Sequence, residues 1–534
     1  MHNFMEQSSL SFIDLFFAKR VLKHLPSGEE SHVVLLATLF ALSRLGHLAI
    51  TTSPRGLETV LEILSIQNGP AFLEFFQKGI ETFPYETPWL VRTSSHVYLQ
   101  KNWTYESQIA LHLKRLNEGP PSFSLNPVVI SELNTEQQQA VQKGLLHSLS
   151  FLSGCPGTGK TFTAAHLVKM CPHNFRIILT APTGKAAFHL EANLKRAVPE
   201  ALNIQTATLH ALLKLGTYQE EEPFSLPADL ILVDECSMID AKVFARLLAS
   251  IATGTRLVLI GDFHQLPPVE AGSLFADLVE ANLYPTTQLT LSLRSSCQGL
   301  LSFAEAIRKA DVEAALSLLH SNPDVEWIET PPQLFSYLWQ RFGSRFVATF
   351  SEKPPLENLM DFLKGFTLLS CLRQGPCGVD ALNAYFFNEV SSRAKEASWM
   401  AIPLMITGND YDLELYNGDL GVLLCKTRSR PLTREFSQED RVVFYTPHGE
   451  IRTFAALSLT SFSLSYCLSV HKSQGSEYEE VLIIAPEGAE IFGREVLYTA
   501  VTRAKKKAFL VTTEELLRKI LLKSSRKLSG FTRG

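Results

Sequence analysis

One eight-residue motif restricts the folds open to this chain more than any other feature of its sequence. The phosphate-binding pattern G-x-x-x-x-G-K-[ST] is met in full by Gly154-Cys155-Pro156-Gly157-Thr158-Gly159-Lys160-Thr161. It follows the apolar stretch Leu149–Leu152 and opens the helical stretch Phe162–Met170, the strand–loop–helix setting that the motif requires. We therefore expect an α/β domain that binds a nucleotide through this P-loop, with Lys160 on the β- and γ-phosphates and Thr161 as a Mg²⁺ ligand.

A second apolar stretch ends in two carboxylates. Leu230–Val233 is followed directly by Asp234 and Glu235. Ligands of open α/β sheets lie at the carboxyl ends of the strands, so we expect Asp234 to hold Mg²⁺ and Glu235 to polarise the attacking water as a base. An Asp-Glu pair after a strand is by itself more often a solvated strand end. Together with the P-loop it predicts nucleotide hydrolysis.

The chain divides into regions of different pattern. From about residue 126, short apolar β-rich runs alternate with helical stretches, which is typical of parallel sheets covered on both faces. The length is too great for one such sheet, so we expect two α/β domains, over 126–293 and 294–534. Residues 1–125 look mainly helical, and turn-punctuated residues at about 400–460 indicate a small β insertion in the second α/β domain.

Composition narrows the function classes only slightly. The 49 basic and 54 acidic residues give a net charge of −5, which neither supports nor excludes DNA, because phosphate contacts need only local clusters of cations. The 8 cysteines form no Cys-x-x-Cys pair, which argues against zinc and disulfides. The sequence shows no signal peptide, and its longest apolar run, Val33 to Leu42, is short for a membrane span, so we expect a cytoplasmic protein without membrane contact. We expect the basic stretch from Arg518 onward to be a solvated, frayed end rather than a DNA contact.

Further motifs occur in a fixed order around the P-loop. They resemble those of superfamily 1 helicases of the 5′-to-3′ branch, over about residues 135–505. The matching segments are Leu133–Gln137 for the Q motif, Thr180–Ala187 for Ia, Thr206–His210 for Ib, Asp234–Met238 for II, Gly261–Val269 for III, Leu291–Ser295 for IV, Val470–Glu477 for V and Tyr498–Ala504 for VI.

This resemblance implies two RecA-like P-loop NTPase domains that face each other across ATP and Mg²⁺. It implies that Gln137 reads adenine, that Gln265 senses the γ-phosphate, and that Arg294 and Arg503 stabilise the charge of the transition state. A single DNA strand would cross both domains. The side chains implied for the strand are Thr183, Lys185, Thr208, His471 and Ser473 on its backbone and His210 and His264 on its bases. Local capping and loop hydrogen bonding is the alternative interpretation of these polar residues.

Three segments are similar to the RecD family in particular. Ser370–Val379 resembles the block that opens the family's second motor domain, and Asn409 with Tyr416–Gly421 resembles the entry to its SH3-like insertion. Gly46–Ile50 and Tyr98–Glu106 resemble its N-terminal domain. The resemblance implies a heterotrimer with RecB-like and RecC-like subunits, in which the N-terminal domain docks on the RecC-like partner and the RecB-like partner carries the nuclease. Such a complex acts on duplex DNA ends in recombinational repair.

Three alternatives stay open at this point. A solitary RecD-like helicase would unwind DNA without RecB or RecC partners. A non-motor subunit would have a decayed nucleotide site, although the complete set of catalytic side chains argues against that. An RNA helicase is not excluded by any residue type, because discrimination through the 2′-OH depends on details of the loops.

Overall fold

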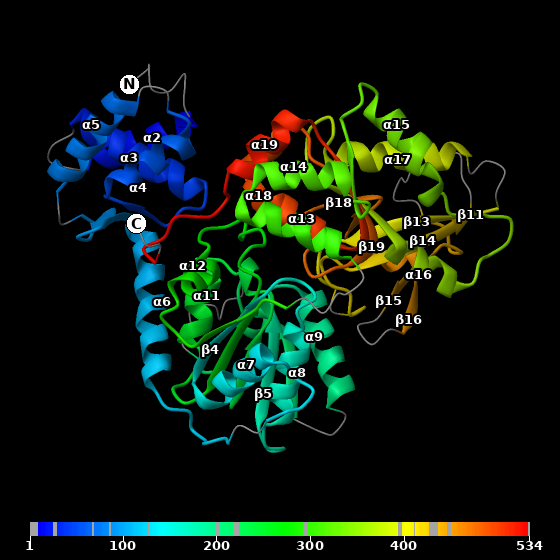
Figure 1. The fold of residues 1–534 in the computed structure, drawn as a ribbon, viewed down its shortest axis with the longest axis horizontal. Helices are drawn as coiled ribbons and strands as arrows, with labels where there is room; N and C mark the ends of the chain where they lie inside the picture. Colours follow the sequence, from blue (N-terminus) through cyan, green and yellow to red (C-terminus); the bar gives the residue numbers. More distant parts are fainter. Residues whose placement is uncertain are drawn as a thin grey trace.

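Two parallel β-sheets form the framework of the computed structural model (Figure 1). The structure describes residues 9–24, 29–66, 69–84, 87–126, 129–198, 203–216, 224–291, 297–393, 398–410, 412–426, 436–445 and 450–531. The boundary that we expected between the two α/β domains falls at residues 292–296, outside these ranges.

The first parallel sheet has six strands in the order β6-β5-β7-β8-β4-β9. Apolar clusters cover both of its faces, one with α11 and α12 and the other with α7, α8 and α9, which explains why its central strands are almost continuously apolar. The strands are β4 Leu149–Gly154, β5 Arg176–Ala181, β6 Asn203–Thr208, β7 Leu230–Val233, β8 Arg256–Gly261 and β9 Thr286–Leu289. The helices are α7 Thr135–Leu146, α8 Lys160–Lys169, α9 Gly184–Ala197, α10 Leu209–Leu212, α11 Ala241–Ala249 and α12 Leu274–Ala281, with the 3-10 turn η1 Cys236–Met238.

The second parallel sheet has five strands in the order β10-β20-β19-β12-β18. Helices α13, α14, α18 and α19 cover one face, and α15 and α17 pack on the other. The strands are β10 Val325–Ile328, β12 Phe366–Ser370, β18 Cys467–Ser469, β19 Tyr478–Ile484 and β20 Ala504–Val511. The helices are α13 Gln298–Lys309, α14 Val312–Ser321, α15 Leu334–Phe342, α16 Leu356–Gly365, α17 Val379–Arg393, α18 Gly493–Val501 and α19 Glu514–Leu522, with 3-10 turns η2 Gly343–Arg345, η5 His471–Ser473 and η6 Ala489–Phe492.

An antiparallel sheet is built from strands inserted between α17 and β18, and the short strand β11, which precedes α16, is added at its edge. Its path is β11-β13-β14-β15-β16, and β17 pairs with β13. The strands are β11 Thr349–Phe350, β13 Trp399–Ile406, β14 Leu420–Lys426, β15 Arg441–Tyr445, β16 Ile451–Ala455 and β17 Phe462–Leu464. The 3-10 turn η4 Ala456–Ser458 lies between β16 and β17. Leu359 of α16 packs on one face of this sheet, so the insertion is attached to the second parallel-sheet unit by apolar contacts as well as by the chain.

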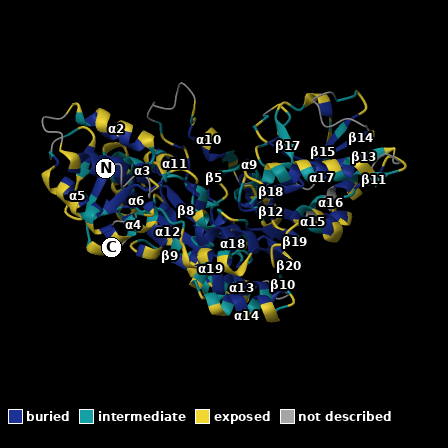
Figure 2. Ribbon diagram, turned by 90° about the horizontal axis from the view of Figure 1, so that it is seen from above, coloured by how far each residue is buried: buried dark blue, intermediate teal, exposed yellow. Residues whose placement is uncertain are grey.

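The N-terminal region has its own apolar core, built from helices and a three-stranded antiparallel sheet of order β1-β3-β2. Its elements are α2 Phe12–Leu22, α3 Glu30–Arg44, β1 Ala49–Thr51, α4 Pro54–Leu64, α5 Gly69–Thr82, β2 Leu90–Arg92, β3 His96–Leu99 and α6 Gln100–Glu118. Coloured by burial, α3 is largely buried within this region, while α2 and α5 carry exposed residues on their outer sides (Figure 2). Among the helices that the structure describes, none is both long and apolar enough to cross a membrane.

Residues 523–531, which we call the strap, contradict the expectation of a frayed basic end. The strap leaves α19, passes α12 and reaches α6 (Figure 1). Ser525 N–H donates to Glu495 of α18 at 2.8 Å, and the N–H of Lys527 donates to Ser273, just before α12, at 2.9 Å. The Leu528 carbonyl accepts from Leu48 N–H at 2.7 Å. The many cations of this stretch favoured the prediction of a solvated end. In the structure, the serines and backbone N–H groups between those cations hydrogen-bond to buried carboxylates.

Glu106 of α6 holds the far end of the strap. The carboxylate is 4% exposed and accepts the N–H of Gly530 at 2.9 Å. Burial raises the pKa of Glu106 to about 7, although the bond from Gly530 opposes the shift. A carboxyl group with a raised folded-state pKa stabilises the fold less as pH rises, and the loss is complete above that pKa.

Glu106→Gln is therefore expected to stabilise the protein at pH 8 by up to about 3 kcal/mol and to change little at pH 4.5. Thermal unfolding of both proteins at the two pH values measures this difference. Glu118→Gln, at the exposed end of the same helix, is the control and should follow the parent protein. A Glu106→Gln protein with the parental pH dependence would contradict the assignment.

Candidate nucleotide and nucleic-acid sites

The P-loop follows β4, and two of its side chains hydrogen-bond to backbone carbonyl groups of the same loop. Gly157 and Gly159 have φ values of 83° and 85°, a left-handed conformation that other residues rarely adopt, which explains glycine at both positions. Thr158 Oγ1 donates to the Cys155 carbonyl at 2.8 Å, and Lys160 Nζ donates to the Gly154 carbonyl at 2.6 Å. Thr161 lies in the first turn of α8. The loop thus brings an ammonium group, a hydroxyl group and the N-terminus of a helix to one point, as phosphate binding requires.

Gln137 is part of the P-loop's support. Its side chain is 2% exposed, and its Nε2 donates to the Thr158 carbonyl at 3.3 Å. Its Oε1 accepts from Asn134 N–H at 3.2 Å and completes a capping box at the start of α7. Both ends of the amide are therefore bonded within the protein. Each end of the amide keeps one further hydrogen-bonding position, so the reading of adenine by Gln137 stays a prediction.

Asp234 and Glu235 follow β7 at the same edge of the sheet. Glu235 has a φ of 52°, and its N–H donates to Asp234 Oδ1 at 2.8 Å. Burial raises the pKa of Asp234, and burial together with the charge of Asp234 raises the pKa of Glu235 to about 7. Lys160 lowers the pKa of both carboxyl groups, and Arg503 lowers that of Glu235, but neither cation outweighs the effect of burial. A hydroxyl and a carboxylate beside phosphates suit Mg²⁺, which prefers few protein ligands, so Thr161 and Asp234 fit this ion.

Asp262, after β8, connects the nucleotide site to α18 of the second sheet. Its carboxylate is buried and accepts from Tyr498 Oη at 2.9 Å and from Gln265 Nε2 at 3.2 Å. Next to it, Leu266 N–H donates to Thr499 Oγ1 at 2.9 Å. Residues of motifs III and VI therefore form one hydrogen-bonded network across the two parallel-sheet units.

Arg503 approaches the two carboxylates from the second sheet. It is 3% exposed, and its guanidinium donates to the Thr499 carbonyl at 3.0 Å and the Ser476 carbonyl at 3.3 Å. Its charge lowers the pKa of Glu235, opposing the effect of burial. A Cβ on Gly475 would lie 3.7 Å from Glu235 Oε1, so motif V also borders this carboxylate. Arg294, the other predicted arginine, lies outside the described residues.

Several side chains expected to contact DNA have structural roles instead. Thr183 caps α9 by accepting from Ala186 N–H, and Thr208 caps α10 by accepting from Ala211 N–H, both at 3.2 Å. Ser473 is 0% exposed and donates to the Val470 carbonyl at 2.7 Å. Lys185 Nζ donates to Ser476 Oγ at 2.6 Å, across the two units. These positions agree with local capping and bridging, and they do not support direct strand contacts by these side chains.

The three histidines differ in their surroundings. His210 is exposed. His264 packs against Phe263 with ring centroids 3.8 Å apart and accepts from Arg308 at 3.1 Å, while burial and then the charge of Arg308 lower its pKa to about 3. His471 lies beside Phe492, with ring centroids 5.4 Å apart. His210 is therefore the most accessible of the three, and His264 and His471 are both half-buried.

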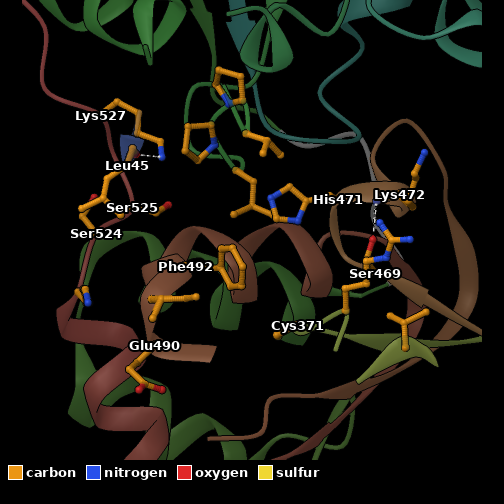
Figure 3. A pocket seen from close by; sticks show the side chains of 18 of the residues that line it. Leu45, Cys371, Ser469, His471, Lys472, Glu490, Phe492, Ser524, Ser525 and Lys527 are labelled. Atoms are coloured by element: carbon orange, nitrogen blue, oxygen red, sulfur yellow. Dashed lines mark hydrogen bonds between the residues drawn. The ribbon is translucent and has the colours of Figure 1, made fainter. Parts of the chain in front are cut away.

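His471 and Phe492 line a cavity of about 1860 Å³ that the residue pattern did not predict (Figure 3). Its walls come from the loop after β8, the two loops at the ends of β12 and β18, the strap and residues before and within α4. The carboxylates among the lining residues are Glu62, Asp380 and Glu490. The cations are more numerous: Arg373, Lys472, Lys519, Lys523, Arg526 and Lys527. An excess of cations beside aromatic rings suits a nucleic-acid backbone.

The P-loop, the paired carboxylates and the arginine that approaches from a second parallel sheet define a P-loop nucleoside-triphosphatase. A family model described as an AAA domain matches residues 132–330, and one described as UvrD-like helicase C-terminal domain matches residues 464–511. The chain is 32% identical over 467 residues to RecBCD enzyme subunit RecD of Mycolicibacterium smegmatis, covering 81% of each chain. It is 29% identical over 430 residues to the ATP-dependent RecD2 DNA helicase of Deinococcus radiodurans, covering 77% of this chain and 54% of the other.

Among solved structures, Pif1 helicase from Candida albicans is 17% identical, with a TM-score of 0.43, over 74% of this chain and 97% of the other. Pif1 helicase from Bacteroides in complex with ADP-AlF3 and ssDNA is 16% identical, with a TM-score of 0.41, over 74% and 94%. The relatives of higher identity decide the assignment: the chain belongs to the RecD family. It is an ATP-dependent DNA helicase.

Proposed function

We propose that the chain is the 5′-to-3′ motor of a RecBCD-type helicase–nuclease that acts on duplex DNA ends in recombinational repair. The observation that carries this proposal is the network that joins Asp262, Gln265 and Leu266 to Tyr498 and Thr499. It connects the nucleotide edge of the first sheet to a helix of the second. A change at the γ-phosphate therefore alters how the two units are held, and alternating closure moves a bound strand.

The catalytic side chains would divide the chemistry of hydrolysis among them. Lys160 neutralises charge on the β- and γ-phosphates, and Thr161 with Asp234 holds Mg²⁺, which would neutralise phosphate charge. Glu235 takes a proton from the attacking water. Gln265 Oε1 is buried and accepts no hydrogen bond from the residues described, while its Nε2 is bonded to Asp262. A carbonyl oxygen accepts but does not donate, so Gln265 suits orientation of the water better than contact with a phosphate oxygen.

Charge stabilisation from the second sheet would come from Arg503, with Arg294 retained as a predicted second arginine. The buried guanidinium of Arg503 already influences Glu235 electrostatically. An arginine that completes the site only when the units close makes hydrolysis depend on closure. This dependence is the property that distinguishes a motor from a simple ATPase.

The strand would occupy the large cavity, where His471 and Phe492 offer stacking faces and the lining cations meet phosphates. We expect a RecC-type subunit to bind the N-terminal region and a RecB-type subunit to supply the nuclease. We expect the complex to work in the cytoplasm. The name RecBCD enzyme subunit RecD, carried by the relatives at 32% identity, supports this assembly.

Arg373→Ala is expected to weaken binding of single-stranded DNA. Loss of one phosphate contact should also reduce the slope of log affinity against log salt concentration by about one. Arg373 lies in the cavity wall after β12, away from the P-loop. Fluorescence anisotropy of a labelled strand over a series of salt concentrations measures both quantities. The control is Lys114→Ala, whose ammonium is 72% exposed on α6 and should have no effect. An unchanged salt dependence would contradict a strand path through the cavity.

Unwinding of forked duplexes tests the proposed function as a whole. Forks with a 5′ tail, a 3′ tail or an RNA loading strand are offered to the purified chain alone and with RecB- and RecC-type subunits. Preference for the 5′ DNA tail, together with co-purification as a heterotrimer, is the expected result. Full unwinding by the monomer would favour a solitary RecD-like helicase, and no ATP turnover with any nucleic acid or partner would favour a non-motor subunit.

A further inference from the structure

The turn that leads into β14 of the insertion packs against the first parallel-sheet unit. Residues 416–419 form this turn, which we call the bridging turn, and the N–H of Asp419 donates to the Tyr416 carbonyl at 2.9 Å. The ring of Tyr416 is half-buried and packs against Phe188 of α9, with ring centroids 4.8 Å apart. A tyrosine of the insertion thus contacts a helix of the other unit.

Gly184, the first residue of α9, is shaped by the same ring. A Cβ on Gly184 would lie 2.6 Å from Cγ of Tyr416 and 2.7 Å from its Cβ, and the three atoms nearest to such a Cβ all belong to Tyr416. These distances are too short for non-bonded carbon atoms. Gly184 has helical backbone that alanine also adopts, so the close approach of Tyr416 explains the glycine.

Polar groups of the bridging turn reach one motif of each unit. Asn417 Oδ1 accepts from Lys472 Nζ of motif V at 2.7 Å. Asp419 acts on Lys185 of motif Ia, because burial lowers the pKa of that ammonium group and the charge of Asp419 opposes the shift. The bridging turn therefore lies between motifs Ia and V, the segments in which the family resemblance places contacts with the strand backbone.

The start of α9 also lies close to the catalytic carboxylate. A Cβ on Gly475 would lie 3.7 Å from Glu235 Oε1 and 4.0 Å from Cβ of Ala186, so Gly475 separates the proposed base from the first turn of α9. Lys185 Nζ, in the same turn, donates to Ser476 Oγ at 2.6 Å. Closely packed groups pass on a displacement because they leave no space to absorb it. A shift of the first turn of α9 is therefore felt at Glu235.

We propose that Tyr416 is a positioning residue that fixes the first turn of α9 and so couples the β insertion to the catalytic carboxylate. A DNA strand that meets motifs Ia and V shifts the bridging turn between them, and α9 carries the shift to Glu235. This inference rests on the motor of the proposed function and adds the residue through which strand binding changes hydrolysis.

Stimulation of ATP turnover by a single DNA strand tests this role. Tyr416→Ala is expected to lower the stimulation about tenfold, the scale of a lost coupling contact. Turnover without DNA and the KM for ATP should stay within about twofold of the parent, because the nucleotide site itself is unchanged. Tyr416→Phe keeps the ring and should keep the parental stimulation. Tyr445→Ala, which removes a half-buried ring from β15 of the same insertion, is the matched control.

Gly184→Ala tests the contact from the other side. Its methyl group would occupy the position of the Tyr416 ring, so stimulation should fall as much as in Tyr416→Ala. In the double variant the methyl group meets no ring, and stimulation should be no lower than in Tyr416→Ala alone. Gly365→Ala is the control, since no atom of the described residues lies within 4 Å of a Cβ at that position. Thermal unfolding of every variant separates loss of coupling from loss of folding.

Three results would overturn the positioning role: parental stimulation in Tyr416→Ala, a double variant whose loss is the product of the two single losses, or an equal fall of turnover with and without DNA. Failure of the motor has a different signature. A parent protein whose turnover no DNA strand stimulates would reject the motor. Equal stimulation of the parent and of Tyr416→Ala would keep the motor and reject only the role of Tyr416.

Discussion

Lys160→Gln is expected to lower DNA-stimulated ATP turnover by about 10²–10³-fold while leaving the fold intact. The ammonium group lies over the P-loop, bonded to the Gly154 carbonyl at 2.6 Å, so it needs little movement to meet the β- and γ-phosphates. Glutamine keeps a hydrogen-bond donor but removes the charge that stabilises phosphate oxygens in the transition state. Steady-state phosphate release, beside thermal unfolding of both proteins, is the measurement.

A matched control exists on the same helix. Lys169→Gln makes the same chemical change in the last turn of α8, away from the loop, and should keep parental turnover. Unfolding temperatures of the parent and both variants should agree, because neither ammonium group is part of an apolar core. Parental turnover in Lys160→Gln would refute the assignment of the P-loop to catalysis.

Glu235→Gln is expected to lower turnover by about 10²–10⁴-fold, the usual contribution of a positioned base, while ATP still binds. The substitution removes a carboxylate whose pKa burial and Asp234 raise to about 7, so it relieves repulsion at the site. ATP affinity should therefore be equal to or higher than that of the parent protein. Because hydrolysis normally ends the closed state, ATP and the DNA strand should remain bound together.

Filter binding of labelled ATP and a labelled strand, combined with single-turnover kinetics, separates binding from chemistry in this variant. Glu270→Gln, in the exposed loop after β8, provides the control for loss of a carboxylate near the site. Rapid cycling with prompt release of DNA by Glu235→Gln would rule out this residue as the base.

The parallel sheets could be predicted from the sequence because their strands are short, nearly continuous apolar runs between helices. Runs such as Leu230–Val233 became β7, buried on both faces. The antiparallel strands of residues 399–464 lie where turns interrupt that rhythm, but whether they form an SH3-like insertion stays a prediction. The strap could not be predicted, since its partners Glu106, Ser273 and Glu495 are distant in sequence and a basic stretch resembles a solvated end.

The candidate site was predictable where one local rule fixes the geometry. The glycines at 157 and 159 and the strand end at Asp234 each follow from backbone chemistry. A motif does not specify the direction in which a side chain points. Thr183 and Thr208 accept from N–H groups of their own helices, and Gln137 donates to the Thr158 carbonyl.

The position of the strap in the chain also determines when its contacts can form during biosynthesis. It lies after every element that it joins, so the ribosome releases it only when the N-terminal region and both parallel sheets have already emerged and begun to fold. Until then Glu106, Ser273 and Glu495 lack the partners that the strap supplies. A nascent chain interrupted before residue 523 would present a complete set of ATPase motifs without the contacts that the strap adds to α6, α12 and α18, and chaperones or proteases would meet it in that state.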